Sequence, residues 1–98
     1  HLIAYNIVNT ADDMESVTQG EVVKFSAGGF RDFTRIAASD PEFWRDVFLN
    51  NRAAVHATLG RFTEDLIALQ RAIRWGQGDN LLRLFSNSRD IRQRIIQA

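Results

Sequence analysis

The sequence predicts an all-α fold, and three features carry that prediction. Apolar residues recur at alternating steps of three and four over residues 41–75, which is the spacing of one helical face. Asp40 followed by Pro41 is a helix start signal, because the carboxylate accepts free amide hydrogens and proline has none to leave unpaired. Gly76 then supplies a stop signal. We therefore expect one long helix over about residues 41–75.

Shorter helices are expected before Asp40. Residues from His1 to about Ala11 place apolar side chains at helical spacing, and the two aspartates that follow predict a short second helix reaching about Thr18. The Ser-Ala-Gly-Gly run at 26–29 predicts a bend. A further helix is expected from Phe30 to Ala38, ending at the Ser-Asp-Pro sequence.

The apolar stripe of the long helix exceeds what one small domain can cover. At 1.5 Å per residue, a helix of about 35 residues extends roughly 50 Å. A compact domain made of all 98 residues would be only about 35 Å across. The same helix of a second chain is the simplest cover, so we predict a symmetric homodimer. The alternative is that Gly60 breaks the helix into a hairpin within one chain. The apolar spacing passes through Gly60 undisturbed, which favours the unbroken helix. The stripe consists of Trp44, Phe48, Asn51, Val55, Thr58, Phe62, Leu66, Leu69 and Ile73.

A C-terminal helix is expected from about Gly78 to Ile96, packed on the long helix. Its outer face is basic. The apolar side chains expected to point inward are Leu82, Phe85, Ile91 and Ile95.

Composition restricts the class of protein. The 98 residues form at most one domain, 1–98, and the 45% apolar content suits a packed helical unit. Twelve basic residues balance twelve acidic ones, so neither nucleic acid nor a membrane surface is an expected partner. The absence of cysteine fits a reducing compartment, which favours the cytoplasm. The chain opens at His1 in an apolar helical pattern with no capping residue, so we expect a fragment whose upstream sequence is missing.

No complete active site is encoded in the chain. Gly28-Gly29 lacks the flanking strand of a phosphate-binding loop, and no histidine lies at metal-ligand spacing. His56, near the middle of the predicted long helix, is interpreted as a solvated or interface histidine. We expect no metal site and no nucleotide site here.

Residues 28–46 are dense in arginine, aromatic side chains and glycine. From composition alone, the arginines would form ordinary surface ion pairs with neighbouring aspartates. However, the run reads Gly-Gly at 28–29, Thr-Arg-Ile-Ala at 34–37, Ser-Asp-Pro at 39–41 and Trp-Arg-Asp at 44–46. It closely resembles the C-terminal signature of the prephenate dehydrogenase family, including arogenate and cyclohexadienyl dehydrogenases. The opening His-Leu-Ile-Ala also resembles the end of that family's Ser-His-Leu-Pro-His motif.

The resemblance implies a fold and an activity. The chain would be the helical substrate-binding and dimerisation domain of an enzyme that oxidises prephenate to 4-hydroxyphenylpyruvate with NAD or NADP, releasing carbon dioxide. The nucleotide-binding Rossmann domain and the catalytic histidine would lie upstream of His1. We therefore expect the isolated chain to be inactive.

The resemblance also implies roles for individual residues. Arg35 matches an arginine that binds a substrate carboxylate, which suits the planar fork of a guanidinium. Trp44 matches a tryptophan of the pocket wall, although a core position in the long helix would equally explain it. Asp32 matches a residue that orients arginine, and His1 a histidine at the pocket edge. Gly28 and Gly29 match a glycine turn that approaches substrate from the neighbouring subunit. Arg31, Arg45 and Asp46 are interpreted as surface or structural residues.

Two alternative functions fit the same sequence. In the first alternative, the parent enzyme prefers arogenate to prephenate, or accepts both substrates as a cyclohexadienyl dehydrogenase. In the other alternative, the chain is a non-catalytic helical dimerisation module, which would explain the long helix but not the segment around Arg35.

Overall fold

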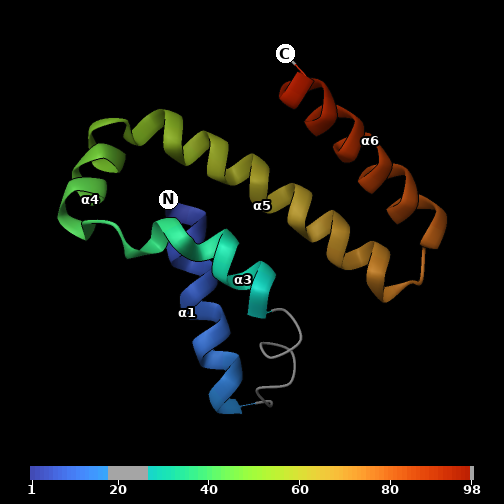
Figure 1. Cartoon of the computed structure of the whole chain (residues 1–98), viewed down its shortest axis with the longest axis horizontal. Helices are drawn as coiled ribbons and strands as arrows, with labels where there is room; N and C mark the ends of the chain where they lie inside the picture. The colour runs from blue at the N-terminus through green and yellow to red at the C-terminus, as the bar shows by residue number, and fades with distance from the viewer. Residues whose placement is uncertain (18–26, 98) are drawn as a thin grey trace. The chain divides into compact units, whose positions relative to one another are not determined.

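The computed structural model describes residues 1–17 and 27–97, and these are helical with short connections and no strand (Figure 1). The all-α prediction is confirmed. The chain divides into two compact units, His1–Arg52 and Ala53–Ala98. None of the described helices is long and apolar enough to cross a membrane. The elements are α1 (Leu2–Val17), α3 (Ala27–Thr34), the 3-10 helix η1 (Arg35–Ala38), α4 (Pro41–Asn50), α5 (Arg52–Arg74) and α6 (Gly78–Gln97).

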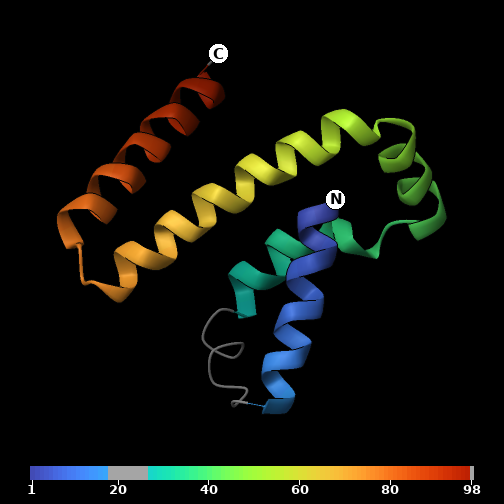
Figure 2. The ribbon, with the colours of Figure 1, turned by 180° about the vertical axis from the view of Figure 1, so that it is seen from behind.

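In the first unit, α1 packs against both α3 and η1, which also contact each other. Figures 1 and 2 show α3 lying across α1. Ala4 is 2% exposed and is the most deeply buried side chain of this unit among those described. The expected division of the first segment into two helices is wrong, because α1 runs unbroken through Asp12 and Asp13 to Val17. Thr18 lies outside the described residues.

The glycine bend expected at 26–29 is also wrong over its described part. Gly28 and Gly29 lie in the first turn of α3, which begins at Ala27, and Ser26 lies outside the described residues. The glycines therefore occupy a helix end and not a reverse turn. The first amide groups of a helix have no acceptor within the helix. The segment predicted as one helix from Phe30 to Ala38 is α3 followed by η1.

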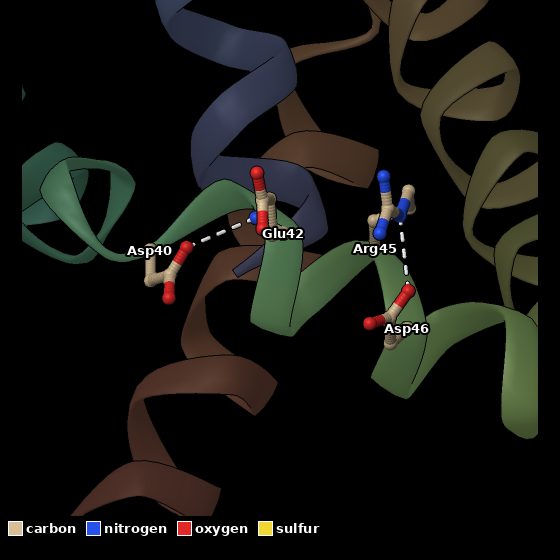
Figure 3. Close-up of polar contacts among 4 residues, drawn as sticks. All are labelled: Asp40, Glu42, Arg45 and Asp46. Carbon is tan, nitrogen blue, oxygen red and sulfur yellow. Dashed lines mark hydrogen bonds and ion pairs between the residues drawn. The ribbon is translucent and has the colours of Figure 1, made fainter.

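The helix start at 40–41 is confirmed. Asp40 is the N-cap of α4, with its Oδ1 accepting a hydrogen bond from the Glu42 amide at 3.1 Å (Figure 3), and Pro41 is the first helical residue. The carboxylate therefore satisfies one of the amide groups that the helix cannot pair internally.

The single helix predicted over residues 41–75 is interrupted at Asn51, so that prediction is wrong. The Asn51 side-chain amide donates to the Val47 carbonyl at 2.9 Å, while its backbone amide donates to the Phe48 carbonyl at 3.3 Å. In a continuous α-helix the backbone amide of residue 51 would use the Val47 carbonyl. The asparagine side chain takes that acceptor, and Asn51 adopts φ −118° and ψ 33° outside the helix.

The alternative break at Gly60 does not occur. α5 continues through Gly60 to Arg74, as the undisturbed apolar spacing indicated. Its 23 residues extend about 34 Å.

The turn between α5 and α6 depends on Gly76. This residue has φ +63°, the left-handed conformation that favours glycine. The Gln77 amide donates to the Ala72 carbonyl at 2.9 Å, and the Gly76 amide donates to the Ile73 carbonyl at 3.2 Å. These two bonds form a Schellman motif, which pairs the last carbonyl groups of α5.

α5 and α6 bury little against each other. From their shared turn the two helices separate along their lengths (Figures 1 and 2), and Ala72 is the buried residue of α5. The expectation that α6 packs on the long helix with its apolar face inward is therefore wrong for the single chain. The residues expected inward on α6 are exposed: Leu82, Phe85, Ile91 and Ile95.

We predict that Gly76→Ala destabilises the chain by about 1–2 kcal/mol, because a Cβ is disfavoured in the left-handed conformation. Urea unfolding at fixed protein concentration, followed by circular dichroism, measures the change. Gly78→Ala is the matched control, since Gly78 begins α6 and a Cβ there meets nothing within 4 Å. Equal losses in the two variants would contradict a special role for Gly76.

A second prediction concerns the cap of α4. Asp40→Ala should cost about 1 kcal/mol of unfolding free energy, because the Glu42 amide loses its acceptor. Asp40→Asn should retain most of the stability, since an amide oxygen also caps a helix. Asp46→Ala is the control, because among the described residues Asp46 bonds only the exposed Arg45 side chain (Figure 3). If Asp40→Ala unfolds at the same urea concentration as the control, the cap does not stabilise α4.

Candidate functional site

Two residues expected at the site, His1 and Trp44, lie in contact. Their rings stack with centroids 3.6 Å apart and planes inclined by 17°. Phe43 contacts the indole edge-on at 5.3 Å, and Phe48 lies at 5.8 Å. Trp44 is partly exposed. It is neither a fully buried core residue nor a free surface ring, because the imidazole covers one of its faces.

Arg35 is the first residue of η1, and its side chain is exposed. No hydrogen bond or ion pair joins its guanidinium to any residue within the described ranges. The packing of η1 on α1 fixes the backbone from which this side chain extends. A permanently charged fork without an internal partner is available to a carboxylate from outside the chain.

The remaining expected site residues are exposed and lie on α3. Asp32 forms no bond to Arg35 in the single chain. A Cβ built at Gly28 or Gly29 would meet nothing within 4 Å. Within residues 1–17 and 27–97, no other segment therefore approaches the glycines closely.

Most of the arginines and aspartates of residues 28–46 do not form the surface ion pairs that composition alone would suggest. Arg45 Nε donates to Asp46 Oδ1 at 2.9 Å, and both side chains are mostly exposed. The hydrogen bond and the adjacent negative charge raise the pKa of Arg45 above its usual value. Asp40 caps α4 instead of pairing with an arginine. The pairing interpretation thus holds for Arg45 and Asp46 but not for Arg35.

Sequence reasoning missed Tyr5. Its hydroxyl donates to the Ser39 carbonyl at 2.9 Å, joining α1 to the connection between η1 and α4. Tyr5 follows His1, the residue before α1, by one helical turn, and its amide donates to the His1 carbonyl at 2.9 Å. The one-turn spacing from His1 was the signal available in the sequence. It does not identify the hydrogen-bond partner of Tyr5, which lies 34 positions away.

The described residues contain neither a cluster of metal-ligating side chains nor a glycine-rich phosphate loop. No group of three or more histidine, cysteine or acidic side chains converges there. Gly28 and Gly29 lie in a helix, and Gly76 and Gly78 flank a turn between helices, so neither pair forms a strand-to-helix phosphate loop. His56 is exposed on α5.

An apolar groove runs along the C-terminal half of α5. Leu66 is 54% exposed and Ile73 is 66% exposed, although both are large hydrophobic side chains. The groove is lined by Thr63, Leu66, Ile67, Leu69, Gln70 and Ile73. It belongs to the second unit, whereas all the expected substrate-binding residues belong to the first.

Comparison with known proteins matches residues 1–87 to the family described as prephenate dehydrogenase, dimerization domain. The chain is 39% identical over 92 residues to a cyclohexadienyl dehydrogenase of Zymomonas mobilis subsp. mobilis, covering 94% of this chain and 31% of that protein. It is 32% identical over 92 residues to a prephenate dehydrogenase of Bacillus subtilis, covering 94% of this chain and 24% of that protein.

A prephenate dehydrogenase of Lactococcus lactis subsp. cremoris is 31% identical over 94 residues, which cover 95% of this chain and 26% of that protein. The chain thus spans about a third or less of the length of the curated relatives it matches.

Proposed function

The chain belongs to the prephenate dehydrogenase dimerization-domain family, and from that premise we propose that it supplies the dimer interface and a substrate carboxylate site to an NAD- or NADP-dependent prephenate dehydrogenase. In the reaction, prephenate is oxidised and decarboxylated to 4-hydroxyphenylpyruvate. The nucleotide and the catalytic histidine are assigned to a part of the enzyme outside this chain. The cytoplasm, where tyrosine biosynthesis would take place, is the proposed location.

The observation that supports the substrate role is the exposed guanidinium of Arg35, which has no partner among the residues that the structure describes. Prephenate has two carboxylates, and arginine binds a carboxylate through two parallel hydrogen bonds that fix its position as well as its charge. The stacked rings of His1 and Trp44 belong to the same unit as Arg35 and suit the wall of a pocket for a ring compound. We assign His1 to the pocket edge and Asp32 to the surroundings of Arg35.

The glycines are assigned to a neighbouring subunit's pocket. Gly28 and Gly29 begin α3 without side chains and have open space around them. Free backbone amides at a helix N-terminus attract anionic groups. This arrangement supports their contact with a substrate bound mainly by a second copy of the chain.

The homodimer proposal rests on the apolar surface of the second unit. Large hydrophobic side chains remain exposed along α5 and α6, and Ala72 is the only apolar side chain in the described part of this unit that is buried. Exposed apolar surface of this extent is typical of protein interfaces. A second copy of α5 and α6 is the proposed cover.

We predict that Arg35→Ala raises KM for the substrate about ten- to a hundredfold, as loss of a charged hydrogen-bonded contact requires. The turnover number should change less, because the lost contact stabilises the bound substrate and the transition state alike. Steady-state kinetics of the intact dehydrogenase, with prephenate and with arogenate, measures both parameters and identifies the preferred substrate.

Arg45→Ala is the matched control for Arg35→Ala. Arg45 is also exposed, but its guanidinium is paired with Asp46. Unchanged kinetics in Arg35→Ala would remove Arg35 from the substrate site and leave the non-catalytic dimerisation module as the better interpretation.

The dimer proposal predicts that Leu66→Glu weakens association about a hundredfold or more. The change removes a leucine from both copies of the interface, at roughly 1.5–3 kcal/mol each, and places two carboxylates in an apolar contact. Sedimentation across a range of concentrations measures the dissociation constant. Ala68→Glu is the control, because Ala68 is exposed on α5 but does not line the groove. Equal weakening by both variants would place the interface elsewhere.

A further inference from the structure

Two side chains, His1 directly before α1 and Tyr5 in its first turn, contact the segment that carries Arg35 and Trp44. The His1 ring stacks on Trp44 at 3.6 Å, and the Tyr5 hydroxyl donates to the Ser39 carbonyl at 2.9 Å. The Tyr5 amide donates to the His1 carbonyl at 2.9 Å, so the two residues are one helical turn apart. Ala4, beside Tyr5, is 2% exposed, so this side of α1 is the one that packs within the unit.

Ser39 occupies the junction between the two expected binding residues. It is the C-cap of η1, with an extended backbone at φ −83° and ψ 170°, and both its amide and its hydroxyl donate to the Ile36 carbonyl. The next residue, Asp40, begins α4, whose first backbone bond runs from the Trp44 amide to the Asp40 carbonyl. The Ser39 carbonyl therefore lies between two helices and belongs to neither ladder.

The Tyr5 hydroxyl is the group that pairs this carbonyl. The bond is partly buried and joins residues 34 positions apart, so it links two elements and not two turns of one helix. A partly buried carbonyl that loses its donor drives the backbone to move toward another donor or toward water. Movement at Ser39 would be transmitted to η1, which is only four residues long and starts at Arg35.

We propose that Tyr5 is a positioning residue for the substrate site, acting through Arg35. Its hydroxyl holds the C-terminal end of η1 against α1, so that the guanidinium is presented in one place before substrate binds. This inference rests on the proposed function, because it requires Arg35 to bind a carboxylate. A small displacement of the guanidinium weakens carboxylate binding strongly, because the two paired hydrogen bonds depend on direction.

The test compares Tyr5→Phe and Arg35→Ala, singly and combined, in the intact dehydrogenase that contains this chain. Tyr5→Phe keeps the aromatic ring and removes only the hydroxyl. The expected result is a rise of KM by roughly three- to tenfold, with a smaller change in kcat. In the Arg35→Ala background the same substitution should change KM less than about twofold, because the group that it positions is absent.

Thr10→Val is the matched control. Thr10 lies on the same helix, is exposed, and bonds none of the residues described. It should leave KM and kcat unchanged. Thermal unfolding of every variant is measured in parallel, so that a loss of folded protein is separated from a change in binding.

Three outcomes overturn the inference in distinguishable ways. If Arg35→Ala raises KM and Tyr5→Phe does not, the positioning role is wrong and the proposed function stands. If Tyr5→Phe raises KM equally in both backgrounds, its effect is structural and does not pass through Arg35. If Arg35→Ala leaves KM unchanged, the proposed function itself fails, and the positioning role fails with it.

Discussion

The exposed apolar surface of α5 and α6 is the constraint on which the rest of the architecture depends. A helix is stabilised mainly by burying one face, and these two helices meet only near their turn, where Ala72 is buried. The Schellman turn at Gly76 therefore sets the direction of α6 without providing a core. The large hydrophobic side chains of this unit stay exposed in the single chain, which is the physical basis for the proposal that the unit serves assembly.

The first unit is organised differently. His1 stacks on Trp44, Tyr5 of α1 donates its hydroxyl hydrogen to the Ser39 carbonyl, and the packing of α1 against α3 and η1 supports the backbone of Arg35. The ring stack and the hydrogen bond are directional contacts, and both hold the segment of residues 35–44 against the N-terminal end of the chain. The Arg35 guanidinium has no hydrogen-bond or ion-pair partner among the described residues, which is consistent with the proposed binding of an external carboxylate.

Asn51 separates these two organisations. Its side-chain bond to the Val47 carbonyl ends α4 and allows α5 to begin as a new helix. The helix with Trp44 and the helix with the apolar groove are consequently distinct elements. A substitution in the groove can then alter association without directly altering the helix that carries Trp44.

The sequence alone determined the helical class, the cap at Asp40, the continuity through Gly60 and the stop at Gly76, because each depends on interactions within a few residues. Family resemblance also predicted site residues, among them Arg35, Trp44 and His1, and their roles stay predictions. The break at Asn51 depended on local competition for one carbonyl, which the uninterrupted apolar spacing concealed. Only the tertiary structure decided which distant groups meet: the Tyr5 hydroxyl with the Ser39 carbonyl, the His1 ring with Trp44, and the exposure of the apolar face of α6. Helical spacing places residues on one face, but packing between elements decides what that face contacts.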